Sequence, residues 1–165
     1  MKAILAYNDR NSEMCRAVVC DSAHLRAKEP FFVPDDRQWY GMVLRGVRID
    51  RLGKNISLKF ADRYYNEVVT AAHPFAGEPE DNAVDRWCRD GALVVSEAVS
   101  AENIDADMRH TLNSLIMECS RNMTLKTGDL VLAGFFDPVF KIENKSYDIF
   151  IPQVKGFPVF RLKIR

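Results

Sequence analysis

Apolar and polar residues alternate along several short segments, and this pattern predicts strands. The segments are residues 2–7, 16–21, 42–50 and 93–99. Their valine, isoleucine, leucine and tyrosine side chains suit the pleated, half-buried surface of a sheet. In the third segment, Val43, Val47 and Ile49 are expected to share one face, because successive side chains of a strand point to opposite sides.

The C-terminal region, residues 130–165, is predicted to be strand-rich as well. It holds the β-branched and aromatic runs DLVLAGFF, YDIFIPQV and PVFRLKI. Turn signals separate these runs, and they lie at Asp137-Pro138, Asn144-Lys145 and Gly156. Short strands bounded by such turns are typical of antiparallel hairpins.

Helical spacing of apolar residues predicts two helices. The first follows a turn in GKNISLKFADRYYNEVV, residues 53–69, with Ser57 as N-cap. Its apolar side chains are Ala61, Tyr64, Tyr65 and Val68. The second spans about residues 106–119, with Asp105 or Asp107 at its N-terminus. Its apolar stripe is Met108, Leu112, Leu115, Ile116 and Cys119.

Residues 73–81, HPFAGEPED, contain two prolines, one glycine and three acids, and we expect a mobile loop there. Taken together, the segments predict an α+β fold that is mostly β, with two packed helices. A chain of 165 residues is long enough for one domain, and we expect residues 1–165 to form a single one.

The composition narrows the class of protein. The formal net charge is zero, which argues against a partner that is nucleic acid or a membrane surface, because such partners select a basic excess. No apolar run reaches the length of a bilayer span, and the N-terminus lacks the apolar core of a signal peptide. We therefore expect a cytoplasmic protein. Its four cysteines lack zinc-site spacing and are expected to be free, buried thiols.

Three segments together resemble the fumarylacetoacetate hydrolase family. SRNMTLKTGDLVLAG, residues 120–134, matches a helix that leads through a T-L-x-x-G-D turn into a strand. RIDRLGKNISLKFADRYYNEV, residues 48–68, is similar to the central part of that fold in its small bacterial members. CRDGALVV, residues 88–95, resembles the segment after the family's catalytic lysine. The three segments occur in the family's order.

The resemblance implies a mixed β roll, often a homodimer, that acts on small 2-keto or 1,3-dicarbonyl acids. Members of the family cleave, decarboxylate or hydrate these acids with Mg²⁺ or Mn²⁺, held by a Glu-x-Glu pair and a later Asp. Carboxylates suit such a hard divalent cation, which polarises the keto acid as a Lewis acid.

The residues of this family site are absent from the matching positions. No carboxylate occurs from Trp39 to Val47, where the Glu-x-Glu pair is expected. His73 stands where the later Asp is expected, and Trp87, with Arg86 beside it, stands where the lysine is expected. His73 and Arg86 remain as candidate catalytic residues. Because Mg²⁺ requires oxygen ligands, the sequence predicts a degenerate, non-catalytic relative with no metal cofactor and a binding or assembly role.

Two alternatives stay open. One is an Mg²⁺- or Mn²⁺-dependent hydrolase, decarboxylase or hydratase whose ligands are recruited from Glu78, Glu80, Asp81 or Asp90. The other is a metal-free protein that binds a small carboxylate through Arg45, since a guanidinium pairs with carboxylates in bidentate fashion.

Each candidate also has an ordinary structural interpretation. His73 would be a histidine of a loop, and Arg45 would point outward from its strand. Five aromatic residues are expected to line or fill the former pocket, and two of them, Trp39 and Trp87, are candidate ligand contacts. The five residues are Trp39, Tyr40, Trp87, Phe135 and Phe136.

Overall fold

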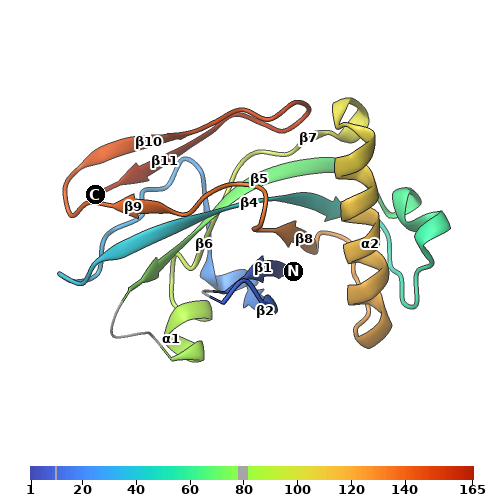
Figure 1. Ribbon diagram of the computed structural model, residues 1–165, viewed down its shortest axis with the longest axis horizontal. Helices are drawn as coiled ribbons and strands as arrows, with labels where there is room; N and C mark the ends of the chain where they lie inside the picture. Colours follow the sequence, from blue (N-terminus) through green and yellow to red (C-terminus); the bar gives the residue numbers. More distant parts are fainter. Residues whose placement is uncertain (10, 78–81) are drawn as a thin grey trace.

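A curled mixed sheet forms the centre of the computed structural model, which describes residues 1–9, 11–77 and 82–165 (Figure 1). The strands are β1 (Lys2–Asn8), β2 (Met14–Cys20), β3 (His24–Arg26), β4 (Trp39–Ile49), β5 (Tyr65–Ala76), β6 (Leu93–Val95), β7 (Val99–Ser100), β8 (Leu130–Ala133), β9 (Phe140–Ile142), β10 (Tyr147–Ile151) and β11 (Phe160–Ile164). The helices are η1 (Asp21–Ala23), η2 (Leu58–Tyr64), α1 (Ala83–Trp87), η3 (Ala101–Asn103) and α2 (Ala106–Asn122), where η marks a 3-10 helix.

The strand order of the main sheet is β2-β1-β8-β4-β5-β6-β3, with β9 paired to β4 and β7 paired to β5. β1 pairs with β8, and β3 with β6, in parallel, whereas the other pairs are antiparallel. β10 and β11 form a separate hairpin. This mostly β, mixed architecture confirms the predicted fold class.

Side chains of the central strands divide between two faces of the sheet. On β4, Met42 and Leu44 belong to one cluster of buried side chains, whereas Val43 and Val47 belong to others on the opposite face. The Met42 side also collects Val19 from the β2 end of the sheet and residues of β6 from the other end. The sheet therefore curls around this side, which we call the roll interior.

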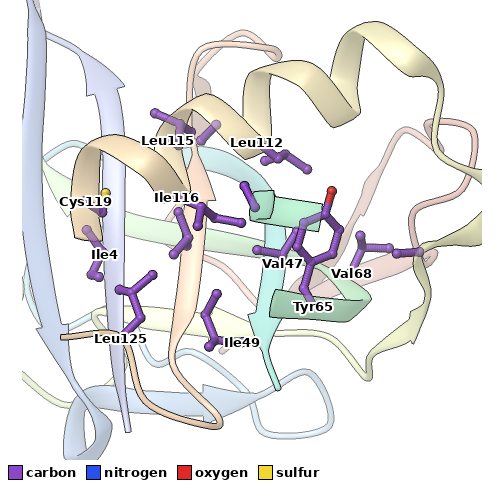
Figure 2. Close-up of a cluster of buried hydrophobic side chains, with 14 of the residues drawn as sticks. Ile4, Val47, Ile49, Tyr65, Val68, Leu112, Leu115, Ile116, Cys119 and Leu125 are labelled. Carbon is purple, nitrogen blue, oxygen red and sulfur yellow. The ribbon is translucent and has the colours of Figure 1, made fainter. Parts of the chain in front are cut away.

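The opposite, outer face is covered by α2 and by the β10–β11 hairpin. Figure 2 shows α2 side chains packed onto Ile4, Val47 and Val68 from three different strands. The predicted apolar stripe of this helix is buried throughout, which confirms the helix near residues 106–119. Asp105 caps its N-terminus, because its carboxylate accepts a hydrogen bond of 2.8 Å from the backbone N–H of Met108.

The predicted first helix is correct in part: residues 58–64 are helical, with Ser57 as N-cap, but the prediction is wrong from Tyr65 onward. A 3-10 helix ends at Tyr64, and Tyr65 begins β5, which pairs with β4 along its whole length. β5 is buried on both faces from Val68 to Pro74, so its sequence lacks the alternation that marks a half-exposed strand. Of the four apolar residues at helical spacing, Ala61 and Tyr64 lie in the 3-10 helix, whereas Tyr65 and Val68 belong to the strand.

The predicted loop at residues 73–81 is also wrong where it can be compared. His73 to Ala76 belong to β5, and residues 78–81 lie outside the described residues. Pro74 is accommodated because β6 pairs only with Ala71 and Ala72, so that side of β5 is an edge at Pro74.

The remaining strand predictions agree with the structure, with small shifts of their ends. Residues 2–7, 16–21 and 42–50 correspond to β1, β2 and β4, while residues 93–99 split into β6 and β7. All four cysteines are free, but the expected burial is correct only for Cys119. No helix within the described ranges is both long and apolar enough to cross a membrane.

We expect the contact between α2 and the sheet to be a main source of stability. Leu112 is fully buried in this contact, and Leu112→Ala should lower the free energy of unfolding by about 2–5 kcal/mol because it leaves a cavity. Leu52 is 70% exposed, and Leu52→Ala should change it by no more than about 0.5 kcal/mol. Urea unfolding measures both. Equal effects would show that α2 contributes little.

Candidate functional site

The positions that the family resemblance assigns to catalysis converge in the roll interior. His73 of β5 pairs directly with Met42 of β4, and Ala71 pairs with Leu44. Cross-strand partners project to the same face, so a Glu-x-Glu pair beside His73 would stand at Met42 and either Tyr40 or Leu44. Those positions carry apolar or aromatic side chains instead.

His73 is fully buried and has both ring nitrogens engaged. Its Nδ1 lies 2.6 Å from the carbonyl oxygen of Ala92, and the Nε–H of Arg86 donates to its Nε2 at 3.3 Å. A carbonyl only accepts and a guanidinium only donates, so the proton must be on Nδ1. This arrangement fixes one tautomer of a neutral imidazole.

The pKa of His73 is lowered to about 3, mainly by burial and in smaller part by the positive charges of Arg86 and Arg89, against the opposing effect of the hydrogen bond to Ala92. The ring is therefore neutral at physiological pH. An efficient general base has a pKa near the working pH, and His73 lies far below that range. Its place in a strand, rather than in the expected loop, explains the shift.

Trp87 and Arg86 reach the site from α1, a short helix capped by Asn82, whose side chain accepts a hydrogen bond from the backbone N–H of Asp85. The Trp87 ring stacks on His73 at a centroid distance of 4.2 Å. The Arg86 guanidinium lies 4.5 Å from the centroid of the Phe75 ring. The position of the family lysine is thus filled by an aromatic ring inside the roll.

A pocket of about 430 Å³ opens beside this stack. Its walls include the ends of β1 and β5, the start of β4, and α1. Residues that line it include Tyr7, Asp9, Tyr40, Met42, Phe75 and Arg86. The volume lies in the range of small-molecule sites, and Arg86 supplies a cationic group in a largely apolar wall.

The described residues of the roll interior do not fit a magnesium or manganese ion. Met42, Leu44 and Ala71 offer no oxygen ligand, and a divalent cation of this kind requires several. Across residues 1–9, 11–77 and 82–165, no group of three His, Cys, Asp or Glu side chains could hold a metal. Glu78, Glu80 and Asp81 lie outside the described residues, and Asp90 is exposed.

Arg45 points away from the roll interior and is fully buried on the outer face. Its Nε and Nη2 donate to the two carboxylate oxygens of Asp137 at 2.9 and 3.1 Å. Nη2 also donates to the carbonyl of Pro152 at 2.7 Å, and Nη1 donates to the Thr70 hydroxyl at 3.4 Å. The carboxylate expected from a ligand is thus supplied by the chain, and this ion pair joins β4 to the C-terminal segments.

The aromatic candidates are not gathered in one place. Trp39 is buried on the outer face, where its Nε1–H donates to Asp35 at 3.0 Å. Phe135 packs against the cluster under α2, whereas Phe136 is partly exposed. Of the five expected pocket residues, Tyr40 lines the pocket, whereas Trp87 stacks on His73.

The T-L-x-x-G-D motif has a structural role. Gly128 has a φ of +91°, which favours glycine, and its N–H donates to the carbonyl of Ile49 at 2.8 Å. The Asp129 carboxylate accepts hydrogen bonds from the backbone N–H groups of Lys2 and Lys126 at 3.0 and 2.9 Å. The motif therefore fastens the start of β8 to β1 and β4, away from the pocket.

Some pocket residues were not found from the sequence. Tyr7, Met42 and Phe75 sit on inner faces of three different strands, and nothing local distinguishes them from core residues. The one available signal was the pair Arg86 and Trp87 at the position of the family lysine, and the structure brings both to His73.

Comparison with solved structures establishes the fold. A protein of Yersinia pestis CO92 assigned to the fumarylacetoacetate hydrolase family has a TM-score of 0.80 at 18% identity, over 99% of this chain and 92% of that one. Yeast Ynq8, a fumarylacetoacetate hydrolase family protein, gives 0.75 at 12% identity, over 99% and 92%. Fumarylpyruvate hydrolase from Pseudomonas aeruginosa, in complex with Mn²⁺ and pyruvate, gives 0.73 at 11% identity, over 99% and 89%.

The chain therefore has the fold of fumarylacetoacetate hydrolase family proteins, as the sequence resemblance predicted. No protein-family model and no curated protein matches the sequence. At such low sequence identity the structural similarity shows the fold alone, and an argument about function must come from the residues of the site.

Removing the partner of Arg45 should be costly. Asp137→Ala leaves a buried guanidinium without its carboxylate and should lower the free energy of unfolding by about 3–5 kcal/mol. Asp148→Ala breaks more exposed pairs with Arg161 and Arg165 and should cost no more than about 1 kcal/mol. Denaturant unfolding compares them. The double variant R45M/D137L should recover much of the loss. If Asp137→Ala were as mild as Asp148→Ala, the Arg45–Asp137 ion pair would have no stabilising role.

The neutral His73 should make stability depend on pH. Its pKa is lower in the folded than in the unfolded state, so its contribution is complete above pH 6.5 and is lost as the pH falls toward 3, by up to about 1.4 kcal/mol per pH unit. His73→Gln should flatten this part of the stability profile. His110→Gln, at an exposed histidine, should leave the profile unchanged. Parallel profiles for wild type and His73→Gln would contradict the assignment.

Proposed function

We propose that this protein binds a small carboxylate without a metal ion and does not carry out metal-dependent chemistry on keto acids. One observation carries the proposal. The inner-face positions opposite His73 and Ala71 hold Met42 and Leu44, two apolar side chains where an ion would need oxygen ligands. The fold supports metal chemistry only where such ligands are present.

Arg86, rather than Arg45, is the cation placed to contact such a ligand. Arg86 lines the 430 Å³ pocket, whereas Arg45 lies on the outer face with Asp137 against its guanidinium. An external anion would have to displace Asp137 to reach Arg45. A guanidinium in a pocket with apolar walls favours a carboxylate, because low dielectric strengthens a charge-assisted hydrogen bond.

A solved structure with this fold supports the choice of ligand class. Fumarylpyruvate hydrolase from Pseudomonas aeruginosa holds Mn²⁺ together with pyruvate, a small carboxylate. We infer that this chain has kept a pocket for an organic acid while the metal positions became apolar. Loss of catalysis and homodimerisation both remain predictions.

Thermal unfolding with and without ligands tests the proposal. In buffer with EDTA, benzoate or pyruvate at a hundredfold its Kd should stabilise the protein by about 2.7 kcal/mol. Arg86→Gln should abolish the stabilisation, whereas Arg161→Gln, at an exposed arginine on β11, should preserve it. Mg²⁺ or Mn²⁺, alone or with oxalate, should leave the unfolding temperature unchanged.

Two results would contradict the proposal. A rise with Mn²⁺ that oxalate enhances would indicate a rebuilt metal site and the enzyme alternative, with ligands sought among Glu78, Glu80, Asp81 and Asp90. A carboxylate effect that survives Arg86→Gln but disappears in Arg45→Gln would return the anion site to Arg45.

A further inference from the structure

The connection between β4 and β5, residues 50–64, forms one end of the molecule. Figure 1 shows η2 and the chain before it beyond α2, at the right-hand end of the long axis. The backbone N–H of Asp50 donates to the Tyr64 carbonyl at 2.8 Å and closes the base of this connection. The backbone N–H of Ile56 donates to the Ser120 hydroxyl at 2.9 Å, which fastens the connection to the end of α2. The connection is therefore a firmly held projection.

Positive side chains gather on this projection and on the chain beside it. Gly53 and Leu125 exchange two backbone hydrogen bonds, at 3.0 and 2.8 Å, which place residues 120–127 next to the projection. The two segments carry six cations against two acids, Asp50 and Asp62, so their net charge is +4, whereas the whole chain sums to zero. The cations are all exposed, and they are Arg51, Lys54, Lys59, Arg63, Arg121 and Lys126. We call this surface the basic end, and the zero total charge does not exclude a partner that meets this surface alone.

Exposed apolar side chains lie among these cations. Leu52 is 70% exposed, Phe60 40% and Leu58 36%. The Lys59 ammonium and the Arg63 guanidinium lie 5.5 and 4.6 Å from the centroid of the Phe60 ring. Such a mixture suits a lipid bilayer, because apolar side chains can enter the boundary with the acyl chains while cations stay with the anionic headgroups.

We propose that the basic end docks on an anionic membrane surface, with Leu52, Leu58 and Phe60 at the headgroup boundary and the cations toward the lipid phosphates. Each cation near an anionic surface adds attraction, and each apolar side chain removed from water adds more. The basic end lies at the opposite end of β4 and β5 from the pocket, and the proposal is independent of the proposed function.

The shape and chemistry of the basic end favour a membrane over other anionic partners. A nucleic acid would pair with the cations but would leave Leu52 and Leu58 in water. Recognition of a peptide commonly uses a groove or a sheet edge, whereas a projecting end meets a broad surface (Figure 1).

Co-sedimentation with lipid vesicles tests the proposal. We expect the protein to bind vesicles of equal parts phosphatidylcholine and phosphatidylserine, and to bind vesicles of phosphatidylcholine alone at least about tenfold more weakly. Added salt should weaken the binding, because it screens exposed charges. Equal binding to the two kinds of vesicle, or binding to neither, would overturn the proposal.

Matched substitutions at exposed positions locate the contact. Lys59→Gln with Arg63→Gln removes two cations and should weaken vesicle binding by about tenfold or more. Lys141→Gln with Lys155→Gln, at two exposed lysines elsewhere, should leave it unchanged. Leu52→Ser should weaken binding by about threefold to tenfold, whereas Val159→Ser, at a side chain 66% exposed, should not.

Two further results would overturn the proposal. Vesicle binding that survives both Leu52→Ser and the Lys59 and Arg63 changes would place the contact on another surface. A single-stranded DNA oligonucleotide, followed by fluorescence anisotropy, provides the second test. If it binds more tightly than the anionic vesicles and is unaffected by Leu52→Ser, the basic end is a nucleic-acid site.

Discussion

Side chains along β4 alternate between the two faces of the curled sheet, and the two faces carry side chains of different kinds. Met42 and Leu44 point into the roll interior, and Arg45, the residue after Leu44, points outward to Asp137. The pairing of β4 with β5 then sets Met42 beside His73. A shift of one residue in this register would exchange the faces, burying Arg45 among apolar side chains without a carboxylate partner. The register therefore decides both the stability of the outer face and the character of the pocket.

In the roll interior, the packing of the His73 ring and the position of the Arg86 charge depend on each other. His73 can be buried as a neutral ring because the Ala92 carbonyl accepts a hydrogen bond from its Nδ1–H and the Nε–H of Arg86 donates to its Nε2. The same bond restrains Arg86, and the rings on both sides of His73 restrain the imidazole. Buried polar groups are tolerated when every hydrogen bond is made, and here the completed set orients a cation toward a pocket.

The likeness to fumarylacetoacetate hydrolase family structures lies in the backbone, while the chemistry of the interior differs from what the family resemblance implies. The Gly128 and Asp129 turn joins β8 to neighbouring strands, and neither residue is among those that line the pocket. The motif serves the fold, because it fixes a left-handed glycine and satisfies backbone N–H groups. Fold and activity are thus carried by different residues, and a fold can outlast one kind of site.

The sequence by itself determined the class of fold, the long helix and most strands, because these depend on local periodicity, capping and turn chemistry. Met108 to Cys119 and the cap at Asp105 are examples. Motif order also predicted where the metal ligands implied by the family resemblance would stand. Only the tertiary structure decided that residues 65–76 form a strand, since burial on both faces erases the periodic signal. Only it placed Arg45 outward and Arg86 at the pocket, because the facing of a side chain depends on partners distant in the chain, such as Asp137 and His73.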